Sequence, residues 1–198
     1  MNSHPPFIHD NDSAGKVRIL TEALRLFARK GLSATSIRDI ANTAGLSNPA
    51  LYKHFKTKDE LAHVLFERLY RSHLRSLQNE VRSENGFQKR FRAFLRCRLR
   101  AYDEQPAGVI FASDNFISLW PHMPKEMKDR TILTLLREII EVGRSEGHVG
   151  TDAAITIQVM VVIGVLEQIT RQMFFDTLSG SAVSLLDEVE RILAKAMT

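Results

Sequence analysis

The chain has 198 residues, of which 44% are hydrophobic and 25% are charged, and its formal net charge is +4 at pH 7. This length is sufficient for one or two domains with a sizeable core, and the composition is that of an ordinary globular protein. The most apolar stretch, residues 153–166, is shorter than the about 20 residues that a membrane-spanning helix needs. We therefore expect no membrane association. The single cysteine, Cys97, excludes an internal disulfide and fits a reducing cytoplasm, where we expect it to be a small buried hydrophobic residue.

Positive charge is concentrated near the N-terminus. Residues 16–58 contain nine Lys or Arg against only Glu22 and Asp39, a net charge of +7, so the remainder of the chain carries −3. A basic segment joined to a slightly acidic remainder favours one part that meets a polyanion and another that does not. Charge alone is a weak indication, because basic side chains often form only a solvated face.

The first part of the chain predicts a disordered segment followed by three helices. Residues 1–15 are polar and rich in Pro, His and Asp, so we expect a disordered tail. A stripe of apolar residues predicts a first helix that ends at Gly31. A second helix begins at Thr35 or Ser36 with a capping box to Asp39, and a short third helix begins at Ser47.

Helical periodicity continues to the C-terminus, and no convincing alternating strand pattern interrupts it. A fourth helix begins with a Thr57–Glu60 capping box and extends to about residue 82. Later helices are expected over residues 87–102, 107–120, 125–147, 152–177 and 182–196. The predicted fold class is all-α, with about nine helices. We place a helix-turn-helix domain over residues 16–62 and a second domain over residues 63–198.

One stretch of this sequence is specific enough to indicate a family. Two short helices separated by a glycine-containing turn describe a helix-turn-helix unit. The motif residues are Ala23, Leu26, Phe27, Gly31, Thr35, Ser36, Ile40, Ala41, Ala44, Gly45, Leu46, Ser47, Leu51, Tyr52, Lys53, His54, Phe55, Lys58 and Leu61. This pattern resembles the DNA-binding domain of the tetracycline-repressor (TetR/AcrR) family, and it covers about a quarter of the chain.

Both the physical pattern and the resemblance indicate residues that contact DNA. The first turn of a recognition helix faces base edges in the major groove, and Asn48 there could contact adenine or could be an ordinary first-turn residue. The resemblance implies phosphate contacts from Tyr52, His54 and Lys58. Helix capping is the alternative role for the Thr and Ser residues, and both roles can coexist. The candidate DNA-binding residues are Thr35, Ser36, Ser47, Asn48, Pro49, Ala50, Tyr52, Lys53, His54 and Lys58.

Position 49 departs from the family pattern. Many family members carry glycine near this position, whereas this chain has proline. Proline removes a backbone donor, so the resemblance cannot supply an amide contact from Pro49.

The C-terminal half is expected to mediate dimerisation. One short recognition helix binds DNA weakly, whereas a symmetric pair reads two half-sites one helical turn apart. The resemblance implies a homodimer through the last two helices, and the helix over residues 152–177 has apolar residues on nearly all sides. Gly164 could permit close approach of a partner helix, or it could serve packing within the chain.

The middle of the chain is expected to bind a small-molecule effector. Aromatic and methionine side chains with a few polar groups are typical of ligand pockets, although a well-filled core gives the same composition. The resemblance favours a pocket whose ligand shifts the population away from the DNA-binding conformation. Arginines at 90, 92, 96, 98 and 100 could favour an acidic ligand or could form a solvated face. The candidate ligand-binding residues are Phe94, Arg98, Tyr102, Phe111, Phe116, Trp120, Met123 and Met127.

Together these patterns predict a ligand-responsive regulator of transcription, most simply a repressor. No histidine spacing indicates a metal site, and no phosphate-binding glycine loop or nucleophile elbow is present, so we expect no catalytic residues, no metal and no cofactor. An activator, a corepressor-dependent regulator and a helical interaction protein that binds no DNA stay as alternatives.

Overall fold

The computed structural model describes residues 5–198, and within that range it contains helices but no strand. This confirms the all-α fold class. The described chain divides into two compact units. The first contains residues 5–72 and Ala107–Pro124, and the second contains His73–Pro106 and Lys125–Thr198. The expected boundary at residue 62 therefore differs from the observed one, because the first unit also includes ten further residues of a long helix and a later segment.

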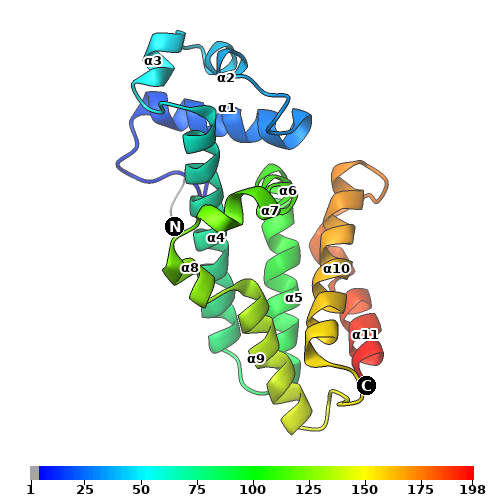
Figure 1. Ribbon diagram of the computed structural model, residues 1–198. Coiled ribbons are helices and arrows are strands. Elements are labelled where there is room, and N and C mark those ends of the chain that lie inside the picture. The colour runs from blue at the N-terminus through cyan, green and yellow to red at the C-terminus, as the bar shows by residue number, and fades with distance from the viewer. Residues whose placement is uncertain (1–4) are drawn as a thin grey trace. The chain divides into compact units, whose positions relative to one another are not determined.

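Three helices form the N-terminal part of the first unit: α1 (Ala14–Lys30), α2 (Ile37–Thr43) and α3 (Asn48–Tyr52) (Figure 1). α1 packs against both α2 and α3. Ser13 caps α1, and Gly31, with φ of 84°, ends it. Ser36 and Asp39 form the expected capping box of α2, and the Ser47 side chain caps α3. Sequence patterns therefore predicted the end of α1 and the caps of α2 and α3 correctly.

Residues 5–13 do not form the disordered tail that their composition predicts. Phe7 is 1% exposed and Ile8 is 8% exposed. The Arg68 guanidinium donates to the Phe7 carbonyl oxygen at 3.1 Å and to the Asp12 carboxylate at 2.5 and 3.2 Å. Burial alone would raise the pKa of Asp12, but hydrogen bonds from Arg68, the His9 amide and Lys16 outweigh burial and hold this pKa well below its usual value. Two apolar anchors and the ion pairs of Asp12 with Arg68 and Lys16 thus fix this segment. Residues 1–4 lie outside the described residues.

The rest of the first unit consists of part of α4 (Lys58–Arg82) with α6 (Pro106–Asp114), α7 (Phe116–Leu119) and the 3-10 helix η1 (Trp120–His122). The single helix expected over residues 107–120 is interrupted at Asn115, whose side-chain amide donates to the Phe111 carbonyl oxygen at 2.9 Å. Pro106 begins α6, where its missing N–H is not needed.

The second unit is built around α5 (Phe87–Glu104), which packs against α9 (Ile132–Ser145), α10 (Ile155–Phe174) and α11 (Leu186–Met197). Residues 73–82 of α4 (Lys58–Arg82) and the short helices α8 (Lys125–Asp129) and η2 (Ala182–Leu185) complete this unit. One helix was expected over residues 125–147, but Thr131 and Thr134 form a capping box that starts α9 anew. No helix of the described residues is long and apolar enough to cross a membrane.

Three contacts show how tightly α5 is held. The Glu146 carboxylate accepts from the Phe87 amide at 2.9 Å and so caps the start of α5. The Asp103 carboxylate, near the end of α5, accepts from the amides of Ala182 and Val183.

Cys97 is 2% exposed, which confirms its expected burial. Burial and the nearby Glu80 carboxylate raise the pKa of the Cys97 thiol to about 12.

Candidate nucleic-acid interface

The first turn of α3 and the residues that follow it form an exposed polar surface. Ser47, Asn48, Pro49 and Lys53 are exposed, and Tyr52 is 50% exposed although it is aromatic. On the opposite side of the helix Leu51 is completely buried. α3 is thus anchored through one side chain and presents its polar face to solvent, as a recognition helix requires.

The start of α2 offers less to a phosphate than the sequence suggests. Thr35 is 1% exposed, and its hydroxyl donates to the Gly31 carbonyl oxygen at 2.8 Å, so this side chain is unavailable to DNA, contrary to expectation. Ser36 is exposed, but its amide donates to Asp39 Oδ2 at 3.0 Å. Hydrogen bonds from Ser36 lower the pKa of Asp39, so this helix start already holds a carboxylate. A DNA phosphate would have to compete with that negative charge.

Lys58 is engaged within the protein. Its Nζ donates to the carbonyl oxygens of Leu32 at 2.7 Å and Thr35 at 2.8 Å, and it lies 3.5 Å from that of Ser33. An ammonium group has three donors, and all three face this loop. The geometry therefore favours a positioning role, in which Lys58 holds the loop before α2 against the start of α4.

His54 and Lys16 lie at the junction of α1 with the residues after α3. A Cβ placed on Gly15 would lie 3.1 Å from His54 Nε2, so the imidazole rests against the first turn of α1. Lys16 Nζ lies 5.8 Å from the centre of the Phe55 ring. His54 remains half-exposed, and its phosphate contact stays a prediction. Of the candidate DNA-binding residues, the structure thus gathers Ser47, Asn48, Pro49, Ala50, Tyr52, Lys53 and His54 on or beside α3.

The candidate ligand-binding residues are divided between the two units. In the first unit, Phe111 stacks on Phe27 of α1 with ring centres 5.5 Å apart and is completely buried, so it belongs to the core. Phe116 and Trp120 stack 4.8 Å apart beside Tyr70, which the sequence analysis did not identify. Met123 is also in this unit and is 5% exposed.

The second unit contains Phe94, Arg98, Tyr102 and Met127. Phe94 is completely buried, and Arg98 Nη1 lies 3.0 Å from His73 Nε2. Burial, followed by the charges of Arg98 and Arg100, lowers the pKa of His73 to about 3. His73 is therefore neutral at pH 7, and its Nε2 accepts the hydrogen bond from Arg98. The sequence does not predict the contact of His73 with Arg98, because nothing in it places His73 against α5.

Comparisons with known proteins agree with this architecture. Residues 19–65 match the family described as "Bacterial regulatory proteins, tetR family". The HTH-type transcriptional regulator AcrR of Shigella flexneri is 41% identical over 66 residues, which are 33% of this chain and 30% of AcrR. The HTH-type transcriptional repressor KstR2 of Mycolicibacterium smegmatis is 46% identical over 43 residues, which are 22% of this chain and 21% of KstR2. The chain thus matches less than a third of the length of either relative.

Similarity of fold extends much further than similarity of sequence. The structure of the ketosteroid transcriptional regulator KstR2 of Mycobacterium tuberculosis has a TM-score of 0.81 and 20% identity, over 96% of this chain and 97% of that chain. The fold and the exposed recognition helix define an all-helical protein with an N-terminal helix-turn-helix unit. Residues 19–65 thus resemble the tetR family of bacterial regulatory proteins in sequence, and the chain as a whole resembles the KstR2 structure in fold.

Proposed function

We propose that this protein is a transcriptional repressor that binds a palindromic operator as a homodimer and is released by a small-molecule effector. The exposed polar face of α3 carries the proposal, since Tyr52 and Lys53 are large and exposed on a helix that Leu51 anchors. The relative KstR2 of Mycolicibacterium smegmatis is named as a repressor, which favours repression over activation.

α4 supports a link between effector and DNA. Residues 58–72 of this continuous helix belong to the first unit and residues 73–82 to the second. Lys58 ties its first turn to the loop before α2, whereas His73, one residue past the boundary, contacts Arg98 of α5. An effector that binds better to one arrangement of the second unit would shift the population of DNA-binding conformations through this helix.

The salt dependence of DNA binding tests this proposal. Affinity for a fluorescently labelled mixed-sequence duplex would be measured between about 50 and 300 mM salt for the wild type and for Lys53→Met. Each lost phosphate contact makes the slope of log K against log salt less steep by about 0.9. For a dimer, which loses two contacts, the slope should therefore become less steep by about 1.8. Lys125→Met, which removes an exposed lysine of α8, is the matched control and should leave the slope unchanged. Absence of binding at the lowest salt would contradict DNA recognition by the apo protein and favour a corepressor-dependent regulator or a helical interaction protein.

A further inference from the structure

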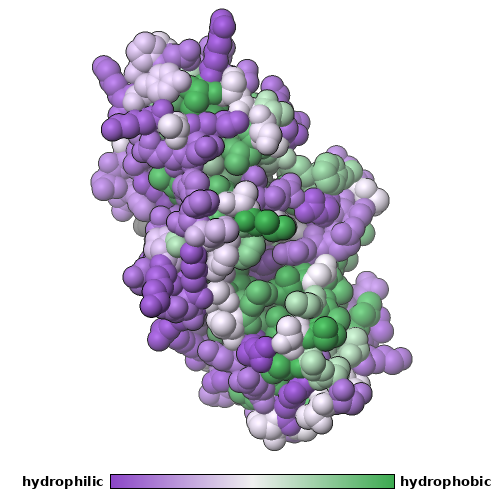
Figure 2. Space-filling view, in the orientation of Figure 1, coloured by the Kyte–Doolittle hydropathy of each residue, from purple (hydrophilic) through white to green (hydrophobic). Residues whose placement is uncertain are grey.

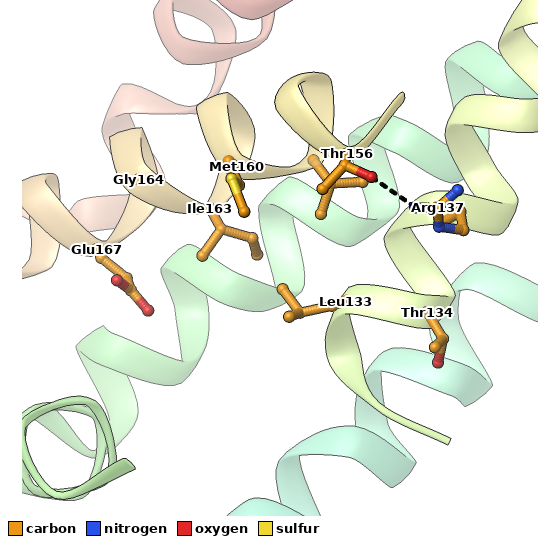
Figure 3. A pocket seen from close by; sticks show the side chains of 9 residues that line it. Leu133, Thr134, Arg137, Thr156, Met160, Ile163, Gly164 and Glu167 are labelled. Atoms are coloured by element: carbon orange, nitrogen blue, oxygen red, sulfur yellow. Dashed lines mark hydrogen bonds between the residues drawn. The ribbon is translucent and has the colours of Figure 1, made fainter. Parts of the chain in front are cut away.

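The exposed apolar surface of the second unit fits the homodimer proposed above. Met160 of α10 is 60% exposed, and Figure 2 shows hydrophobic surface gathered over α10 and over its junction with α9. A groove of about 410 Å³ lies between these two helices, with Leu133 and Ile163 in its apolar middle (Figure 3). A partner subunit that covers α10 accounts for this surface. A pair of histidines in the first unit has no role in DNA binding or in dimerisation.

This pair consists of His63 in α4 and His122 at the end of η1. The two ring centres are 5.3 Å apart, and the ring planes make an angle of 82°. His122 is exposed, whereas His63 is half-buried. The sequence does not predict this contact, because the two residues are far apart in the chain and meet only where η1 lies against α4.

A backbone hydrogen bond orients the ring of His63. Its Nδ1 lies 2.7 Å from the carbonyl oxygen of Asp59, one helical turn earlier. Since a carbonyl oxygen only accepts, Nδ1 carries the proton, and in the neutral ring Nε2 presents a lone pair. Metal-binding histidines almost always have this arrangement, in which one ring N–H donates to a carbonyl or carboxylate and the other nitrogen binds the metal.

The Nε2 atom of His63 is buried and forms no hydrogen bond with any residue in the range 5–198. Most buried side-chain polar atoms have a hydrogen-bond partner, so an exception calls for a specific explanation. The ring that lies nearest in kind is His122, which brings two further nitrogen atoms to the same place. A cation bound to Nε2 would use a lone pair that the described residues leave without a donor.

We propose that His63, through Nε2, and His122 together bind one divalent transition-metal ion of the Zn²⁺, Ni²⁺ or Cu²⁺ class. With metal–nitrogen distances of about 2.0–2.1 Å and tetrahedral geometry, two coordinated imidazole rings have centres roughly 5 Å apart. The 5.3 Å between His63 and His122 matches this separation. The rings meet edge to face, so the exposed His122 rotates about its side-chain torsions to direct a nitrogen at the ion.

The ligand atoms determine the class of metal and the strength of binding. Imidazole nitrogen suits zinc, copper and nickel, whereas magnesium and calcium take oxygen ligands. No group of three or more His, Cys, Asp or Glu side chains that could hold a metal occurs within the described part of the chain, so water completes the coordination. The exposed Asp59 adds negative charge one turn before His63. For this pair the proposal replaces the sequence-based expectation of no metal, and it does not depend on DNA binding.

Zinc binding by the full chain, prepared without a histidine tag, tests the site. Titration calorimetry near pH 7 would give the stoichiometry and the zinc dissociation constant for the wild type, His63→Gln, His122→Gln and the double variant. The wild type should bind one zinc ion at this site, and each single variant should raise the dissociation constant by at least about 10-fold. The double variant should bind no more weakly than the weaker single variant, because either substitution already removes the chelate.

His148→Gln is the matched control. His148 is an exposed histidine of the second unit, 3.9 Å from the Glu146 carboxylate, and its replacement should leave the zinc dissociation constant unchanged. Because His122 is exposed, His122→Gln should keep the far-ultraviolet circular dichroism of the wild type, so this variant tests the site even if His63→Gln unfolds. A wild type that binds no zinc at millimolar concentrations, or a loss on His148→Gln as large as on His122→Gln, would overturn the proposal. Losses that add in the double variant would also overturn it.

Discussion

At the scale of single residues, Lys58 belongs to the DNA-binding motif but is engaged with carbonyl oxygens of its own chain. The motif places a lysine at the start of the helix after the recognition helix, where a phosphate contact is expected. In the structure the ammonium group instead donates to carbonyl oxygens of the loop before α2. This cradle fixes the loop that ends at Ser36, the N-cap of α2, and so stabilises the arrangement that presents α3.

Substitution of Lys58 distinguishes the two roles. Lys58→Met should lower the free energy of unfolding by about 1–3 kcal/mol, because it leaves carbonyl oxygens without a charged donor. It should weaken DNA binding by a similar factor at every salt concentration without changing the salt slope. Lys58→Arg should not restore binding, since a planar guanidinium does not match a cradle of converging carbonyl oxygens. Chemical denaturation and affinity measured across a salt series check both expectations.

A phosphate contact would give a different pattern. Lys58→Met would then reduce the magnitude of the slope by about 1.8 for a dimer, and Lys58→Arg would bind at least as well as the wild type. Either observation would contradict the positioning role.

At the scale of helices, two glycines make opposite predictions. A Cβ added at Gly143 of α9 would lie 2.6 Å from both Phe87 Cδ2 and Val149 Cγ2, whereas one added at Gly164 of α10 meets nothing within 4 Å. Gly143→Ala should therefore lower the free energy of unfolding by about 1–3 kcal/mol through overpacking. Gly164→Ala should lower it little or raise it by about 0.5–1 kcal/mol, since alanine favours the helix. Urea titrations at protein concentrations that keep the chain monomeric would measure the free energy of unfolding of both variants. Equal changes in the two variants would contradict the described packing.

A second prediction at this scale concerns the contact between α5 and η2. The Asp103 carboxylate accepts from the Ala182 amide at 2.7 Å and from the Ser181 hydroxyl at 2.6 Å. Burial alone would raise its pKa, but these hydrogen bonds outweigh burial and lower it. The stabilisation is thus present above the unfolded pKa, near 3.8, and is lost as the pH falls through the folded value. Asp103→Asn should lower the thermal midpoint at pH 7, and the difference from wild type should shrink towards pH 3. A pH-independent difference would exclude this role.

Helix starts and ends were predictable because local side chains determine them. Ser36 with Asp39, Ser47 and Gly31 each stop or start a helix through contacts within four residues. The breaks at Asn115 and Thr131 were missed, because apolar periodicity continues across both positions. The N-terminal segment was mispredicted for a different reason. The ordered structure of this segment depends on Arg68, which is far away in the sequence. The polar composition of the segment does not predict that contact.

Among the candidate site residues, too, features set by local sequence could be predicted and features set by distant contacts could not. The exposed face of α3 could be predicted, since Leu51 and Phe55 mark the buried side of a helix and leave Tyr52 and Lys53 outside. Burial of Thr35 and engagement of Lys58 could not, because both depend on the path of the loop between α1 and α2. The groove between α9 and α10 was also missed. A helix that is apolar all round does not reveal which side its own chain covers.

At the scale of the whole molecule, stability should depend on pH through His73. Burial lowers its pKa to about 3 in the folded chain from an ordinary value of 6.5, so the unfolded chain binds a proton that the folded chain resists. The free energy of unfolding should therefore fall as the pH drops below 6.5, by up to about 1.4 kcal/mol per pH unit. His73→Gln keeps an acceptor for Arg98 but does not titrate. It should lose less stability than the wild type between pH 7 and pH 5.5 in urea denaturation, and equal losses would contradict the burial of His73.

Operator recognition by two copies of this chain through α3 is tested most directly by selection of binding sites from a random pool of duplex DNA. Purified wild-type protein at near-physiological salt should enrich an inverted repeat whose half-site centres lie about one helical turn, roughly 34–36 Å, or a multiple of it, apart. The same selection with Tyr52→Ala and Lys53→Ala combined should lose that enrichment. Enrichment of no sequence, or of a single half-site without its inverted copy, would contradict operator recognition by a symmetric dimer.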